Sequence, residues 1–271
     1  RYGLDTISAG GTIAFAIECY ENGLISKKDT DGIELTWGNH QAIVAMTEKL
    51  AKREGFGAIL ADGVKIAAEK IGKGTDKYAM HIHGQETPTA DPRGEPSTGL
   101  IYQTDATPGR HMRAIGPAKG GKTFPLEKGV YTGIGAVGAW VNNYGYMLDA
   151  AGICMFINCA LSPADISSML AGVTGWKYSE EELIRVGERI ACTCQAFNVR
   201  EGLKPSDFKL PDRALGKPPL KEGPTANITI DMDTMVKEYF EVRDWDIGTG
   251  KPSKKKLQEL GIEDVAKKLW P

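Results

Sequence analysis

Apolar residues recur at helical spacing over much of the chain. Two segments near the N-terminus show this pattern, with inward positions expected at Ile13, Ile17 and Tyr20 in the first and at Ile43, Met46 and Leu50 in the second. A third segment at 178–198 carries a stripe of Leu183, Val186, Ile190, Cys194 and Phe197. Such stripes predict amphipathic helices that pack against a core.

Helix-end signals agree with these segments. Thr6 or Ser8 can cap the first helix, and the Asn22-Gly23 pair is typical of its end. Ser179 and Glu182 have the spacing of a capping box at the start of the third segment.

The remaining stretches carry weaker signals. Residues 79–84 alternate like a short strand, and 86–96 is rich in Pro, Thr, Asp and Gly, which indicates a loop and a domain junction. Residues 116–138 favour a loop, and 203–226 favour an extended segment. The tail predicts two short helices, SKKKLQELG and EDVAKKLW. Because no β-α-β alternation appears, we predict a mainly α fold.

The composition limits the classes of function. The chain has 271 residues, enough for one large domain or two smaller ones. Its hydrophobic content of 41% is ordinary for a globular protein, and its net charge of −2 gives no support to nucleic-acid or anionic-membrane binding. No apolar run approaches the roughly 20 residues that span a bilayer. Since the sequence opens on RYGLDTISAG without Met, we expect it to be the C-terminal portion of a longer chain.

The cysteines indicate a compartment. There are five, at 19, 154, 159, 192 and 194. An odd, scattered set without a secretory segment indicates a reducing compartment, so we expect a cytoplasmic location. Cys159 is interpreted as a core residue. Cys194 lies on the apolar stripe and Cys192 should point elsewhere, so the pair is assigned no metal.

The most distinctive short motif is D-x-x-G-I-C over residues 149–154, within YMLDAAGICMFINC. Glycine lets a backbone approach a ligand closely, an acid accepts hydrogen bonds from the amino groups of a heterocycle, and a thiolate binds soft metals or iron–sulfur clusters. A helix with a free cysteine explains the same residues. Gly3-Leu4-Asp5 has a related glycine–apolar–acid ending, which suggests two half-sites that face one ligand.

His111 is a candidate for proton transfer. It follows a Thr-Pro-Gly turn in a loop that also holds Arg110 and Arg113. The loop fits a proton-transfer group or an anion clamp, and it fits an exposed basic loop equally well.

The other histidines are weaker candidates for metal binding. His81 and His83 should face the same side of a strand, but no third ligand stands near them in the sequence. His40 follows a helix start at Asn39, and a place in the cap region explains it better than metal ligation.

Several words of the sequence together resemble the tungsten-containing aldehyde:ferredoxin oxidoreductases. They keep the family's order over nearly the whole chain: GLDTISAG, WGNH, ADPRG, LDAAGIC, TGWKYSEEELIRVGERI and AFNVREG. The resemblance implies two largely helical domains from the C-terminal half of such a protein, with the N-terminal β-rich domain missing. It implies that 1–80 is part of helical domain 2 and that 81–271 is helical domain 3.

The resemblance also implies roles for single residues. The family has two D-x-x-G-L-(C/D) motifs that hold a tungsten bis-pterin, and the second one here has Ile153 in place of Leu. The implied pterin-binding residues are Gly3, Leu4, Asp5, Asp149, Gly152, Ile153 and Met155. Cys154 is similar to the fourth ligand of a [4Fe-4S] cluster, whose other ligands come from an upstream C-x-x-C-x-x-x-C segment. His111 is similar to a histidine near the tungsten, and His40 to a metal-binding histidine at a dimer interface.

The chemistry implied by the resemblance is oxidation of an aldehyde to a carboxylic acid. His111 would accept a proton, and electrons would pass through the cluster to ferredoxin. The upstream portion of the same protein is an expected partner, and a homodimer and Mg²⁺ belong to the expectation. Because TPGRHMRA departs from the commoner form of this loop, two alternatives stay open: a same-family enzyme with another substrate, such as an aromatic acyl-CoA reductase, and a non-catalytic helical subunit.

Overall fold

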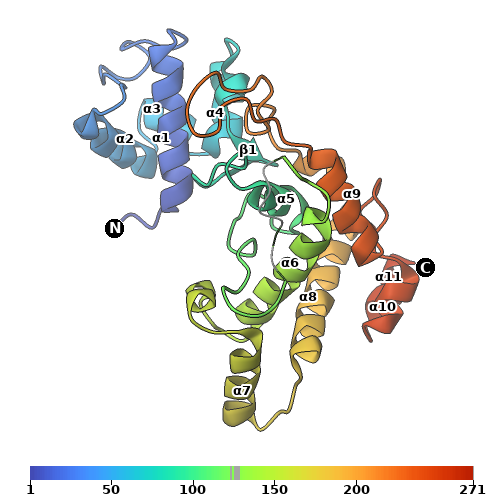
Figure 1. Cartoon of the computed structure of the whole chain (residues 1–271). Coiled ribbons are helices and arrows are strands. Elements are labelled where there is room, and N and C mark those ends of the chain that lie inside the picture. Colours follow the sequence, from blue (N-terminus) through green and yellow to red (C-terminus); the bar gives the residue numbers. More distant parts are fainter. Residues whose placement is uncertain (123, 125–128, 271) are drawn as a thin grey trace. The chain divides into compact units, whose positions relative to one another are not determined.

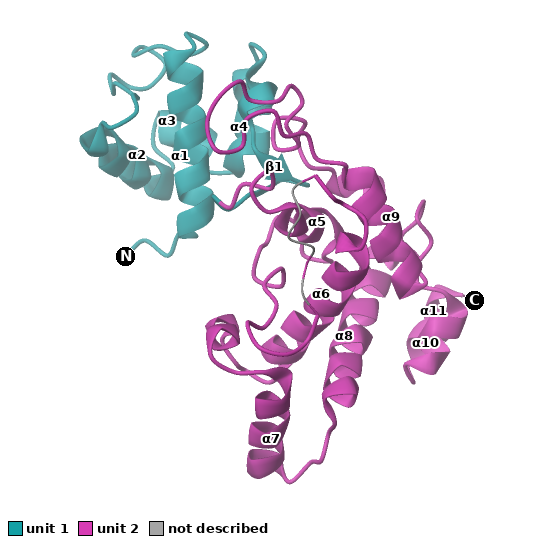
Figure 2. Cartoon of the chain, in the orientation of Figure 1, with its two compact units in different colours: residues 1–89 teal, residues 90–271 magenta. Residues whose placement is uncertain are grey.

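A computed structural model describes residues 1–122, 124 and 129–270 of the chain. The chain forms two compact units, Arg1–Thr89 and Ala90–Pro271, which Figure 2 colours separately. The division lies inside the 86–96 stretch that the composition marks as a junction. Assignment of 1–80 and 81–271 to two family domains stays a prediction.

Unit 1 is helical apart from one short hairpin (Figure 1). Its elements are α1 (Thr6–Glu21), α2 (His40–Lys52), α3 (Phe56–Leu60), α4 (Gly63–Ile71), the 3-10 helix η1 (Thr75–Tyr78) and the strands β1 (His81–Ile82) and β2 (Gln85–Glu86). The strands are antiparallel, with His81 opposite Glu86. The core contains Phe15, Ile17, Leu35, Met46 and Leu60, all buried.

Three details of unit 1 differ from the sequence prediction. Asp5, and neither Thr6 nor Ser8, caps α1, because its Oδ2 accepts a hydrogen bond from the Ser8 backbone N–H at 2.8 Å. Ile43 is 39% exposed, since the narrow inward stripe of α2 consists of Ala42, Met46 and Leu50, each four residues apart.

The third difference concerns the strand at 79–84. Only His81 and Ile82 pair within it, and His83 adopts a positive φ of 52° in the turn of the hairpin. His81 and His83 therefore do not alternate along one strand as predicted.

In the described part of unit 2 the regular elements are helices, joined by long loops that contain two isolated β-bridges (Figure 1). Its elements are α5 (Pro96–Thr104), α6 (Ile134–Ala150), η2 (Met155–Cys159), α7 (Pro163–Thr174), α8 (Glu180–Arg200), η3 (Pro205–Phe208), α9 (Met232–Arg243), α10 (Lys254–Glu259) and α11 (Glu263–Leu269). Helix α6 is central to the unit, because it packs against α5, α8 and α9. The mainly α prediction is confirmed.

Glycines and one acid fix the position of α6. A Cβ at Gly187 of α8 would lie 1.8 Å from the Asn143 carbonyl oxygen, so only glycine permits this approach of the two helices. At the start of α6, the Glu238 carboxylate of α9 accepts hydrogen bonds from the backbone N–H groups of Gly133 and Gly135 at 2.8–3.1 Å. An anion at a helix N-terminus accepts hydrogen bonds from the free N–H groups and interacts favourably with the helix dipole.

The inward face of α8 differs from the predicted stripe. The capping box of Ser179 and Glu182 is confirmed. However, Phe197 is 54% exposed and Cys192 is buried, whereas Cys194 is only partly buried. Close contact with α6 requires small residues, so the buried face consists of Leu183, Gly187, Ala191, Cys192, Gln195 and Ala196.

The predicted loop at 116–138 is shorter than expected, because α6 already begins at Ile134. Residues 123 and 125–128 of that loop lie outside the described residues. The two short helices in the tail are confirmed as α10 and α11. Within the described ranges, every helix is too short or too polar to cross a membrane.

Candidate functional site

The D-x-x-G-I-C motif forms the end of α6 and the turn after it. The Ile153 N–H donates to the Leu148 carbonyl at 3.0 Å, and the Gly152 N–H donates to the Asp149 carbonyl at 3.1 Å. Gly152 adopts a φ of 69°, so these bonds form the Schellman ending that favours glycine. The glycine therefore has a structural reason of its own. An added Cβ would meet none of the described residues within 4 Å, so the backbone at Gly152 is also open to a ligand.

The turn presents an acid and a thiol. The Asp149 side chain is 51% exposed, and Cys154 is exposed in an extended conformation directly after the turn. Met155 is 7% exposed and lies largely inside the fold. Cys159 is exposed, contrary to the prediction of a core residue, because η2 directs Met155 and Asn158 inward instead.

Arg113 holds the Asp149 carboxylate. Its Nε donates to Asp149 Oδ2 at 2.8 Å, and its Nη1 donates to Asp105 Oδ1 at 3.0 Å. Burial lowers the pKa of the guanidinium, but the carboxylates of Asp105 and Asp149 raise it by more, so that the net pKa lies above its ordinary value. Arg113 is therefore a permanent cation between two acids, and it lies 4.0 Å from the centre of the Tyr146 ring.

Asp105 continues this contact into the interior of unit 2. Its side chain is 1% exposed and accepts hydrogen bonds from Asn142 Nδ2 at 2.7 Å and from the Tyr146 hydroxyl at 3.2 Å. Asn142 Oδ1 in turn accepts from the Tyr239 hydroxyl at 3.0 Å and from Arg243 Nη2 at 2.8 Å. We call Asp105, Arg113, Asn142, Tyr146, Tyr239 and Arg243 the buried polar network.

The sequence analysis did not predict the buried polar network. Its one local signal is the Asn142-Asn143 pair inside an otherwise apolar helix, where a buried amide needs a partner. The partner, Asp105, lies 37 residues away in the sequence, so no local pattern could identify it.

His111 lies in the same loop as Arg113. It is partly buried, and its carbonyl accepts from the Ala114 N–H at 2.9 Å. Through Arg113, the structure links this loop to the Asp149 turn. Two of the predicted site segments thus meet within unit 2.

The first turn belongs to unit 1. Gly3 has a φ of 72° with open space around it, and Leu4 packs against the core of this unit. Asp5 is exposed and also caps α1. Joint binding of one ligand by this turn and the 149–154 turn stays a prediction.

The remaining histidines were weaker candidates for metal binding, and the role of His40 at a dimer interface stays a prediction. Over residues 1–122, 124 and 129–270, no three His, Cys, Asp or Glu side chains lie together as a metal site would require. His40 is exposed as the first residue of α2. Burial lowers the pKa of His81, whose Nδ1 accepts the Gly84 N–H at 3.2 Å within the hairpin, so this histidine has a structural role.

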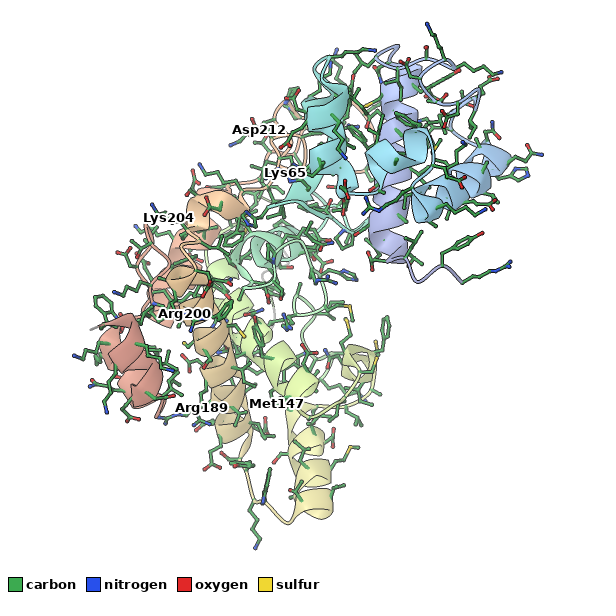
Figure 3. All side chains as sticks on the ribbon, turned by 180° about the vertical axis from the view of Figure 1, so that it is seen from behind. Lys65, Met147, Arg189, Arg200, Lys204 and Asp212 are labelled. Atoms are coloured by element: carbon green, nitrogen blue, oxygen red, sulfur yellow. The ribbon has the colours of Figure 1, made fainter. Side chains whose placement is uncertain are left out.

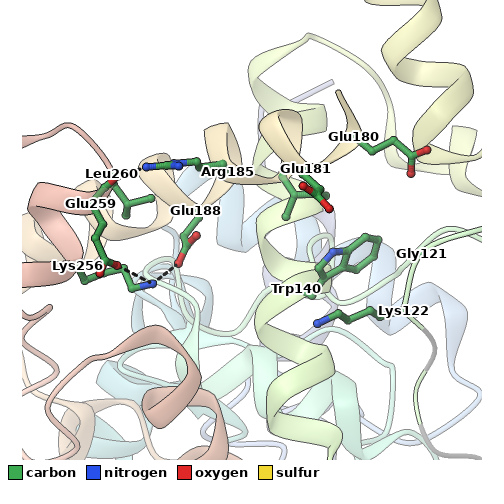
Figure 4. Close-up of a pocket in the computed structure, with 11 residues that line it drawn as sticks. Gly121, Lys122, Trp140, Glu180, Glu181, Arg185, Glu188, Lys256, Glu259 and Leu260 are labelled. Atoms are coloured by element: carbon green, nitrogen blue, oxygen red, sulfur yellow. Dashed lines mark hydrogen bonds and ion pairs between the residues drawn. The ribbon is translucent and has the colours of Figure 1, made fainter. Parts of the chain in front are cut away.

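A hollow of about 840 Å³ in unit 2 lies beside Trp140 (Figure 4). Lys256 lines this hollow and forms ion pairs with Glu188 at 3.2 Å and with Glu259 at 3.8 Å. None of the predicted site residues lines it. Because it lacks the residues of the D-x-x-G-I-C motif and His111, the candidate site stays at the 149–154 turn.

A family model described as "Aldehyde ferredoxin oxidoreductase, domains 2 & 3" matches residues 1–262. The chain belongs to this family. The tungsten-containing aldehyde ferredoxin oxidoreductase of Pyrococcus abyssi is 36% identical over 271 residues, which cover 97% of this chain and 44% of the relative. The protein of the same name from Thermococcus kodakarensis is 33% identical, with 97% and 44% covered. The chain thus spans less than half the length of these relatives, and it corresponds to their helical domains.

Two further likenesses show the range of this fold family. A Pyrococcus furiosus protein named "Aliphatic sulfonate oxidoreductase, WOR-like subunit" is 30% identical over 285 residues, covering 98% of this chain and 42% of the relative. A solved active-site complex, BamBC of benzoyl coenzyme A reductase with 1,5-dienoyl-CoA, matches with a TM-score of 0.75 at 22% identity, covering 98% of this chain and 45% of that one. The second likeness shows the fold alone.

Proposed function

We propose that this chain supplies half of the cofactor site of a tungsten oxidoreductase that converts aldehydes to carboxylic acids. Membership of the family supports the class of enzyme. The observation that carries the site is the 149–154 turn, which combines an open glycine, a half-exposed acid held by Arg113 and an exposed thiol.

The residues of this turn fit a pterin and one iron ligand. Arg113 Nε reaches Oδ2 of Asp149, and no other described donor reaches this carboxylate, so it can still accept from an amino group. Cys154 offers a thiolate for a [4Fe-4S] cluster. Gly3, Leu4 and Asp5 would contribute the second pterin contact, although Asp5 also has its capping role. Mg²⁺, and His40 at a homodimer interface, belong to the proposal through the family likeness alone.

The reaction consumes one aldehyde and one water and yields a carboxylic acid, two electrons and two protons. The bound tungsten–pterin group supplies the two-electron redox chemistry. His111 accepts one of the protons, and Arg113 Nε holds the Asp149 carboxylate at 2.8 Å. Ferredoxin takes the electrons one at a time.

Metal content tests this proposal. The protein, including the portion that completes the length of its relatives, is produced without oxygen in the presence of tungstate. We expect both tungsten and iron in the wild-type protein, and a loss of iron in Cys154→Ser. Cys159→Ser is the matched control, because this thiol is also exposed five residues further along, and it should keep its iron. A wild-type protein without either metal contradicts the proposal, as does equal iron loss in both variants.

The substrate is the second question, because one relative is named for sulfonates. Reduction of a viologen dye with aldehydes, and with aliphatic sulfonates in parallel, separates the two candidates. Viologen-driven reduction of an aromatic acyl-CoA without any aldehyde turnover would favour the acyl-CoA reductase alternative. A metal-loaded protein that turns over none of these compounds would favour the non-catalytic subunit.

A further inference from the structure

The Arg113 side chain packs against α6 at Gly145 and Tyr146. A Cβ at Gly145 would lie 2.9 Å from both Cβ and Cγ of Arg113, so the absence of a side chain at position 145 makes room for the arginine. The guanidinium lies over the Tyr146 ring, with 4.0 Å between its carbon and the ring centre. Packing therefore fixes the arginine independently of the two acids.

The two acids then use different nitrogens of one rigid group. Nε meets Asp149, and Nη1 meets both Asp105 at 3.0 Å and the Thr107 hydroxyl at 2.8 Å. Asp105 is itself held by Asn142 and Tyr146 from α6. A planar guanidinium that is held at one edge by a buried acid presents its other edge in a fixed direction. The orientation of the half-exposed Asp149 therefore depends on the buried polar network.

We propose that Arg113 is a positioning residue, which orients the Asp149 carboxylate for the pterin and fixes the His111 loop against the end of α6. The cofactor part of this inference rests on the proposed function. The loop part rests only on contacts within unit 2. Partners that orient a ligand-binding side chain commonly change affinity for the bound group by one or two orders of magnitude when they are replaced.

Arg113→Lys is the informative variant, because lysine keeps the charge but cannot meet both acids from two nitrogens of one plane. We expect the pterin bound per protein, measured by fluorescence after oxidative release, to fall on the order of tenfold under limiting cofactor. Arg200→Gln is the control. It removes a positive charge on α8 whose side chain is 55% exposed, pairs with its neighbour Glu201 and lies over the Phe197 ring, and the residue is labelled in Figure 3.

A double-mutant cycle separates positioning from general destabilisation. If Arg113 acts through Asp149, Arg113→Lys should cause no further pterin loss in an Asp149→Ala background. If Arg113→Lys retains as much pterin as the wild-type protein, the inference is overturned. It is also overturned if the pterin losses of Arg113→Lys and Asp149→Ala simply add in the double variant.

Amide hydrogen exchange tests the loop part without cofactor. Exchange at Ala114, whose N–H bonds the His111 carbonyl, should speed up at least severalfold in Arg113→Lys and stay unchanged in Arg200→Gln. Unchanged exchange in Arg113→Lys would overturn the loop part. Absence of pterin from the wild-type protein would overturn the proposed function together with the cofactor part, and the exchange result would then decide the loop part by itself.

Discussion

The two glycine turns of this chain have similar sequences and different structural settings. At Gly3 the turn leads into a helix, and its acid, Asp5, is held by the backbone N–H of Ser8 three residues later. At Gly152 the turn ends a helix, and its acid, Asp149, is held by Arg113, 36 residues away in the sequence. The capping contact of the first acid is local, whereas the Arg113 contact of the second acid is tertiary.

This difference teaches where each half of the proposed site is vulnerable. A helix cap forms wherever its helix forms. The Asp149 contact requires a loop, two helices and a buried acid to be in place at once. Substitutions remote from the second turn should therefore disturb it, and comparable substitutions around the first turn should have only local effects.

Asp105→Ala should have the largest effect. It removes the acid from the buried polar network, leaves the donors of Asn142 and Tyr146 without this acceptor, and breaks the ion pair with Arg113. Breaking a buried ion pair costs roughly 3–5 kcal/mol. By contrast, Asp5→Ala should cost about 1 kcal/mol, the usual loss for a helix N-cap. The free energies of unfolding, obtained from hydrogen exchange in α6 and in α1, measure the two losses, and equal losses would remove the contrast.

Thiol reactivity should separate the second turn from the helix interiors. Burial raises the pKa of Cys192 to about 11 from 9.0, which lowers its thiolate fraction at neutral pH about a hundredfold. Cys19 is buried as well, and its pKa is raised to about 12. In the metal-free protein, iodoacetamide should modify Cys154 and Cys159 quickly, and Cys19 and Cys192 only after unfolding. Peptide mass spectrometry over time measures the rates.

The raised pKa of Cys192 also predicts how the stability of the fold changes with pH. Because the folded-state pKa of Cys192 exceeds that of the unfolded thiol, its contribution to stability is complete below about pH 9 and disappears as the pH rises toward 11. Cys192→Ala should flatten this part of the stability curve, measured by denaturant unfolding at several pH values. A curve of unchanged slope would contradict the assignment.

Replacement of the glycine in either turn by alanine should reduce stability by a smaller amount, and by the same amount in both turns. Gly3 and Gly152 both have φ near +70° with open space around them, so Gly3→Ala and Gly152→Ala should each cost about 1–2 kcal/mol from backbone strain alone. Gly10→Ala in α1 and Gly172→Ala in α7 are the controls. Both are exposed helical positions with open space, where alanine should stabilise by up to about 1 kcal/mol. Melting temperatures of the four variants measure these effects.

The smallest expected effect is the most diagnostic for the comparison. Asp5→Asn should leave stability unchanged, because asparagine caps a helix as well as aspartate does. Asp149→Asn loses the charge that faces Arg113 at a half-exposed site, and should cost no more than about 1 kcal/mol. Denaturant titration of both variants tests this, and a larger loss for Asp5→Asn would reverse the proposed difference.

The sequence predicted well whatever depends on neighbours along the chain. The helical periods at 6–21 and 180–200 and the capping box at Ser179 are local, and the structure confirms them. The prediction of the inward face of α8 was wrong. Hydrophobicity alone favours Phe197 as an inward residue, whereas close contact with α6 requires small residues such as Gly187. Arg113 was seen only as a member of a basic loop, since its partners become neighbours only in the folded chain.

Gly187 has a consequence for the variation that this protein can tolerate. A methyl group at this position would displace the backbone of α6 at Asn143 by more than an ångström. Asp149 lies six residues further along the same helix, about 9 Å along its axis. A residue with no side chain, on a different helix, therefore restricts the geometry of the acid. We expect a saturation library at position 187, selected for the function of the protein, to return glycine alone.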